Sequence, residues 1–70
     1  MDAVVECRSE HEYAERPVAL TWQSRRLEVS EILARWRTPG EKRFRVRTAD
    51  GQIFELAYVA AEDEWQIHQP

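Results

Sequence analysis

Three arginines at alternate positions, Arg43, Arg45 and Arg47, form the clearest group of side chains that could do chemistry. On a β-strand, residues two apart project to the same face and lie about 7 Å apart. Guanidinium groups make forked contacts with phosphate oxygens, so this row could bind the backbone of a nucleic acid. Arg35 and Arg37 have the same spacing and could extend the row if their strand lies beside it.

The same arginines could instead be neutralised by carboxylates on neighbouring strands. Glu28, Glu31 and Glu55 are candidates, and each cross-strand pair would contribute only about 0.2–1 kcal/mol. Eight of the ten Lys and Arg residues lie within residues 17–49, but the whole chain has 13 Asp and Glu and a net charge of −3. An acidic chain does not suit a dedicated nucleic-acid binder, so neutralisation is the favoured interpretation.

The chain offers little for catalysis or metal binding. Cys7 and His11 could pair as nucleophile and base, but both lie in a charged stretch that we expect to be the least organised part. The only glycines, Gly40 and Gly51, lie in predicted turns and form no phosphate-binding loop. The acidic residues 62–64 lack the spaced ligands of a calcium loop. We therefore predict no catalytic residues, no metal and no cofactor.

The cysteine content indicates a reducing compartment. Cys7 is the only cysteine, so no internal disulfide can form, whereas a secreted domain of 70 residues would normally need one. The first residues have no basic start followed by an apolar run of signal length. The longest apolar stretch, residues 57–61, is far too short to cross a membrane. We predict a cytoplasmic protein with no membrane partner and no small-molecule substrate.

Alternation of apolar and polar residues predicts that most of the chain is β-strand. Large side chains recur at every second position from Val18 to Trp22 and again at Leu27 and Val29. The polar residues between these runs predict a hairpin, although its turn lacks the Asn-Gly pair typical of such loops. We expect residues 1–15 to be an N-terminal strand or flexible arm and residues 16–70 to be a single β-domain.

Residues 30–37 allow two interpretations. Apolar residues here recur at helical spacing, and Ser30 could cap a short helix. Alternatively, the preceding strand continues through a bulge near Ser30-Glu31, which would turn Ile32, Ala34 and Trp36 inward. We favour the bulged strand because the segment is only about two helical turns long. With this bulge, all three tryptophans would lie in the core: Trp22, Trp36 and Trp65. Of these, Trp36 is the one that we expect to be partly exposed.

The register of the hairpin around Gly51 can be predicted from which side chains each register places on the same face. A two-residue loop would place Val46 opposite Glu55 and mix apolar and charged side chains on both faces. A three-residue loop ending at Gly51 instead places Val46 opposite Phe54, and Arg45 opposite Glu55. A slip of one residue would exchange the faces, so we predict the three-residue loop.

A four-residue loop at residues 60–63 then brings Trp65 opposite Tyr58 in the last predicted strand. The predicted fold class is all-β, an antiparallel meander of five or six strands. We expect the sheet to curl into a small open barrel because its edges need covering. The only alternative element is the short helix at residues 30–37.

Several segments follow one another in a recognisable order and spacing: residues 16–23, 25–29, 32–37, 44–51 and 54–56, with a closing Trp65. Together they resemble a family of small bacterial β-domains of unknown function. Similar arrangements occur near the C-terminus of some proteins related to Y-family translesion DNA polymerases. The match covers roughly residues 16–68, and Ser24 and Leu27 depart from it, where the family commonly has a glycine and an aromatic residue. The order and spacing of the segments, rather than any single motif, carry the resemblance.

The resemblance implies an accessory β-domain in a context of DNA damage tolerance, and it transfers no catalytic residues. From the residues themselves we predict a non-enzymatic interaction module whose partner is another protein, met through a sheet edge or through the arginine face. The alternative is an auxiliary nucleic-acid-binding module. That alternative would use Arg35, Arg37, Arg43, Arg45 and Arg47.

Overall fold

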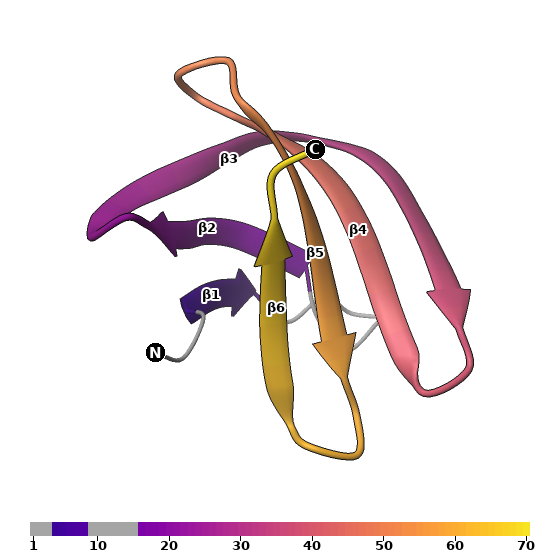
Figure 1. Cartoon of the computed structure of the whole chain (residues 1–70). Coiled ribbons are helices and arrows are strands. Elements are labelled where there is room, and N and C mark those ends of the chain that lie inside the picture. Colours follow the sequence, from indigo (N-terminus) through magenta and orange to yellow (C-terminus); the bar gives the residue numbers. More distant parts are fainter. Residues whose placement is uncertain (1–3, 9–15) are drawn as a thin grey trace.

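The computed structural model describes residues 4–8 and 16–70, and the regular structure in them is entirely β-strand (Figure 1). Each of six strands pairs antiparallel with the next one along the chain, in the order β1-β2-β3-β4-β5-β6. The strands are β1 (Val4–Arg8), β2 (Arg16–Trp22), β3 (Arg25–Thr38), β4 (Glu41–Thr48), β5 (Ile53–Val59) and β6 (Glu64–His68). The predicted all-β meander is confirmed, and residues 30–37 are strand rather than helix.

The sheet curls into a half-barrel because the long strand β3 belongs to both of its halves. Residues 25–28 pair with β2, whereas residues 29–38 pair with β4. As a result, β1 and β2 run across the direction of β4, β5 and β6 (Figure 1). The inner face of this curl holds the core.

Six buried side chains form the core, and two tryptophans pack onto it. Trp22 lies edge-on to Phe54, with ring centroids 5.3 Å apart, and Trp65 lies 5.9 Å from Phe44. Both tryptophans therefore have the inward position that the alternation predicts. The buried cluster consists of Leu20, Leu27, Phe44, Val46, Phe54 and Leu56.

The β4–β5 hairpin has the predicted three-residue loop. The backbone N–H of Thr48 donates to the carbonyl oxygen of Gln52 at 2.8 Å, and Gly51 has a φ of 87°. That left-handed conformation favours glycine because it has no Cβ. Val46 lies opposite Phe54 on the inner face, and the outward pairing of Arg45 with Glu55 is confirmed in the same register.

The β2–β3 hairpin turns more tightly than its polar sequence suggests. Trp22 pairs directly with Arg25, so the loop contains only Gln23 and Ser24. Both loop residues have positive φ, 50° and 65°, as in a type I′ turn, whose twist matches the flanking strands. Two residues with side chains thus occupy a conformation that favours asparagine and glycine.

Strand β3 contains two bulges, of which only the first is predicted. The first lies at Ser30, between the pairs that Val29 and Glu31 make with β4, and the Ser30 hydroxyl donates to the carbonyl oxygen of Arg47 at 3.1 Å. The second lies between Ile32 and Ala34. Each bulge inserts one residue and so exchanges the faces of the residues that follow.

The second bulge turns Trp36 outward. Trp36 lies opposite Arg43, and Ala34 lies opposite Arg45, both on the outer face of β4. Trp36 is 36% exposed. The expectation that Ala34 and Trp36 point inward is therefore wrong, because it allowed for one inserted residue in β3 where the strand has two.

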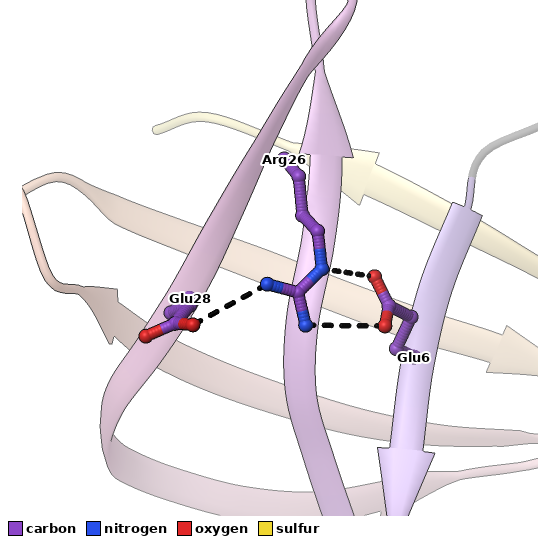
Figure 2. Close-up of polar contacts among 3 residues, drawn as sticks. All are labelled: Glu6, Arg26 and Glu28. Carbon is purple, nitrogen blue, oxygen red and sulfur yellow. Dashed lines mark hydrogen bonds and ion pairs between the residues drawn. The ribbon is translucent and has the colours of Figure 1, made fainter.

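An ion-pair cluster ties β1 to β3 across the outer face of β2 (Figure 2). The Arg26 guanidinium donates to both carboxylate oxygens of Glu6, at 2.7 and 3.2 Å, and to Glu28 at 3.3 Å. Ala19 lies between Glu6 and Glu28 in the strand register and is fully buried. Hydrogen bonding from Arg26 lowers the pKa of the Glu6 carboxyl below its usual value.

We expect the pKa of Glu6 to rise toward its ordinary value in an Arg26→Gln variant. A carboxyl whose folded-state pKa is lowered stabilises the fold at neutral pH, and this contribution is lost as the pH falls through the folded-state pKa. Carboxyl carbon NMR titration of Glu6 measures the shift directly. Arg25→Gln, which removes a neighbouring arginine, should leave the titration of Glu6 unchanged. An unchanged Glu6 pKa in Arg26→Gln would contradict the pairing.

Candidate interaction face around Trp36

The three arginines of β4 lie on its outer face, as predicted, and each makes an ion pair. Two of the carboxylates come from the neighbouring strands β3 and β5, and the third lies two residues earlier on β4 itself. Nearby carboxylates therefore pair with all three arginines of the row. The pairs are Arg43–Glu41 at 3.2 Å, Arg45–Glu55 at 3.0 Å and Arg47–Glu31 at 2.8 Å.

Trp36 lies among these arginines rather than in the core. The guanidinium carbons of Arg43 and Arg45 lie 6.0 and 5.9 Å from the centroid of its ring. Cation–π contacts at such exposed sites contribute about 0.5–1 kcal/mol each. We call Trp36, Arg43, Arg45 and Arg47 the Trp36 face.

Packing beneath Arg43 fixes one end of the Trp36 face. Ala57 lies opposite Arg43 on the outer side of the sheet and is only 4% exposed. The Nε of Arg43 is buried and has no hydrogen-bond partner among the described residues. Arg43 is thus held between the sheet, the carboxylate of Glu41 and the ring of Trp36, so its side chain has little freedom to lose on binding.

Arg35 and Arg37 do not extend the arginine row. Arg35 lies opposite the buried Phe44, and Arg37 lies opposite Lys42. Residues directly opposite each other share a face, so both arginines project to the inner side of the sheet. The five arginines that could have formed one patch are divided between the two faces, because the second bulge in β3 reverses Arg35 and Arg37.

The other candidate residues do not form a reactive or metal-binding group in the described part of the chain. Cys7 is half-buried on β1 opposite Pro17, and its expected partner His11 lies outside the described residues. Asp63, in the acidic turn, accepts a hydrogen bond from the hydroxyl of Tyr58. Within residues 4–8 and 16–70, no three His, Cys, Asp or Glu side chains gather closely enough to hold a metal ion. The same residues contain no helix of the length and apolarity needed to span a membrane.

No protein-family model, no curated protein and no solved structure matches this chain. The resemblance to small bacterial β-domains therefore stays a prediction, and only the geometry of the two sheet faces bears on function. Two features of that geometry were missed from the sequence. They are the outward position of Trp36 and the place of Lys42 beside Arg37 on the inner face.

Proposed function

We propose that this domain is a non-enzymatic protein-interaction module and that the Trp36 face is its contact surface. The observation that supports this is the exposed ring of Trp36, which lies against two arginines of β4. Tryptophan and arginine are the residue types that most often dominate the binding energy of protein interfaces. Because ion pairs already position the arginines, ordering them on binding would lose little side-chain entropy.

Nucleic-acid binding by the arginine row is the less well supported alternative on this face. A phosphate approaching Arg45 or Arg47 would meet the carboxylates of Glu55 and Glu31 at the same guanidinium groups. Like charges there oppose a polyanion, whereas a protein surface of mixed charge can match both signs. A partner protein in DNA damage tolerance is what the bacterial-domain resemblance would imply.

We expect Trp36→Ala to weaken binding of the partner by about thirtyfold or more, the loss typical of a dominant interface residue. Leu33→Ala is the matched control, because Leu33 lies on the same strand and is also 36% exposed. Affinity purification with the wild-type domain would identify candidate partners, and calorimetry with each purified candidate would measure the affinities. Both variants should keep the wild-type circular dichroism spectrum because neither side chain lies in the core.

The outcomes separate the two functions. A purified partner that binds wild type and Trp36→Ala equally would contradict the proposed contact surface. A variant with Arg43, Arg45 and Arg47 all changed to Ala tests the alternative. If that variant loses a salt-dependent affinity for DNA that Trp36→Ala retains, the arginine row is a nucleic-acid site and the proposal fails.

A further inference from the structure

The inner face of the sheet carries cations that the Trp36 face does not use. Strand register places Arg37, Lys42, Tyr58 and Trp65 side by side in one row that crosses β3, β4, β5 and β6. Neighbours in such a row lie about 5 Å apart. We call these four residues the inner row. Arg35 lies beside it, in the adjacent row opposite Phe44.

The row lies at the end of the half-barrel that β1 and β2 do not pair with. Beyond residue 28, β3 pairs with β4 and not with β2. The ends of β3 to β6 that carry the turns at residues 39–40 and 60–63 project below β1 and β2 in Figure 1. A depression of about 200 Å³ lies at the edge of the sheet at this end. It is lined by Arg37 and Lys42 of the inner row, by Thr38 and Glu41 of the outer face, and by Gly40 and Ala60.

The cations of the inner face are not neutralised in the described part of the chain. Arg35, Arg37 and Lys42 make no ion pair there, in contrast to the three arginines of the outer face. The carboxylates on β3 to β6 all take outward positions in the strand register, opposite outward residues such as Arg45 and Val59. Although the net charge of the chain is −3, these three cations of the described residues therefore lie without ion pairs on one short stretch of the inner face.

Two aromatic rings complete the inner row. Tyr58 and Trp65 are half-buried, and their ring centroids lie 5.3 Å apart at an interplanar angle of 52°. The Tyr58 hydroxyl donates to Asp63, and Trp65 packs against Phe44 of the core. Both rings are thus held in place beside the cations. Cations that contact phosphates beside rings that stack on bases are the combination used to bind single-stranded nucleic acids.

We propose that the inner row binds single-stranded nucleic acid, with phosphates at Arg37 and Lys42 and bases against Tyr58 and Trp65. A single strand fits this chemistry because its bases are available for stacking, whereas those of a duplex are enclosed in base pairs. An acidic peptide would use the cations alone and gain less from the rings. This site is separate from the Trp36 face, so it stands whether or not that face binds a protein.

The matched comparison is between two double variants that each remove two positive charges. Arg37→Gln with Lys42→Gln alters the inner row, and Arg45→Gln with Arg47→Gln alters the outer face. Fluorescence anisotropy of a labelled oligothymidylate of about 12 nucleotides should show at least tenfold weaker binding by the inner-row variant. We expect less than a threefold change for the outer-face variant. Between about 50 and 200 mM salt, loss of two phosphate contacts should reduce the salt slope by about 1.4.

Tryptophan emission tests the stacking part of the proposal. In a Trp36→Phe background the remaining indoles are Trp22, which lies against Phe54 in the core, and Trp65. Oligothymidylate should quench this emission, and the quenching should be lost in the inner-row variant.

Any of four results would overturn the site. Three of them are equal losses in the two double variants, binding without quenching, and an oligoglutamate peptide that binds as tightly as the oligothymidylate. The fourth is the absence of any oligothymidylate binding at the lowest salt.

Discussion

Changing Phe54 to alanine is expected to lower the free energy of unfolding by about 3–5 kcal/mol. The side chain is fully buried, faces Val46 across the hairpin and makes the edge-on contact with Trp22. Its loss would leave a cavity where the two halves of the half-barrel meet. Globular domains are stable by only about 5–15 kcal/mol, so much of this variant should be unfolded at physiological temperature. Urea denaturation followed by circular dichroism measures the change.

Ile53→Ala is the matched control for Phe54→Ala. Ile53 precedes Phe54 on the same strand, but it lies opposite Arg47 on the outer face and is only partly buried. We expect its truncation to destabilise the domain by about 1 kcal/mol, in the ordinary range for a partly exposed site. Equal losses at the two positions would contradict the assignment of inner and outer faces in β5.

Replacing Gln23 and Ser24 by Asn and Gly is expected to stabilise the domain by about 1–2 kcal/mol. Both residues have positive φ, which costs about 1–2 kcal/mol for most residues with a side chain. Asn-Gly is the pair that a type I′ turn favours. In a domain of this size, each kcal/mol gained should raise the melting temperature by about 4–8 °C. Thermal unfolding followed by circular dichroism measures the shift.

A variant that removes a glycine from the β4–β5 turn, Gly51→Ala, serves as the control. Gly51→Ala adds a Cβ that meets nothing within 4 Å, so any loss reflects the φ of 87° alone. We expect that loss to be about 1 kcal/mol. If the Asn-Gly variant were no more stable than wild type, the two-residue loop between Trp22 and Arg25 would be wrong.

Much of the fold could be predicted because the two sheet faces differ chemically. In the β4–β5 hairpin, only the three-residue loop sorts Phe44, Val46 and Phe54 to one face and Arg45 with Glu55 to the other. That register is the observed one. The same two-residue period predicted the inward positions of Trp22 and Trp65.

The second bulge in β3 was not predicted because the residues around it include none of the types that commonly mark a bulge. The residues around it, Leu33 and Ala34, include no glycine and no proline. A signal does exist at the β3–β4 turn, where Gly40 has a φ of 79° and follows Pro39, as in a type II turn. This two-residue loop pairs Thr38 with Glu41, and counting back from it places Trp36 opposite Arg43.

The second bulge arises because two fixed strand pairs, Ile32 with Val46 and Thr38 with Glu41, are separated by different numbers of residues on β3 and β4. Ile32 must face inward opposite Val46, and the Pro39–Gly40 turn fixes Thr38 opposite Glu41. The chain from Ile32 to Thr38 is one residue longer than the chain from Glu41 to Val46. The extra residue has to leave the ladder, and it does so at Leu33, whose side chain remains exposed.

Both proposed contact surfaces depend on this single inserted residue. It puts Trp36 among the ion-paired arginines of the outer face and leaves Arg35 and Arg37 on the inner face. With one bulge fewer, Trp36 would lie inward and the five arginines would share the outer face. The division of the arginines between two faces is therefore the central structural claim.

A NOESY spectrum of the isotopically labelled domain tests that claim most directly. The bulged register predicts contacts from the indole protons of Trp36 to the side-chain methylenes of Arg43 and Arg45. It also predicts contacts from the Arg35 side chain to the ring of Phe44. Contacts from the Trp36 indole to the ring of Phe44 instead, with Arg35 beside Arg45, would contradict the claim.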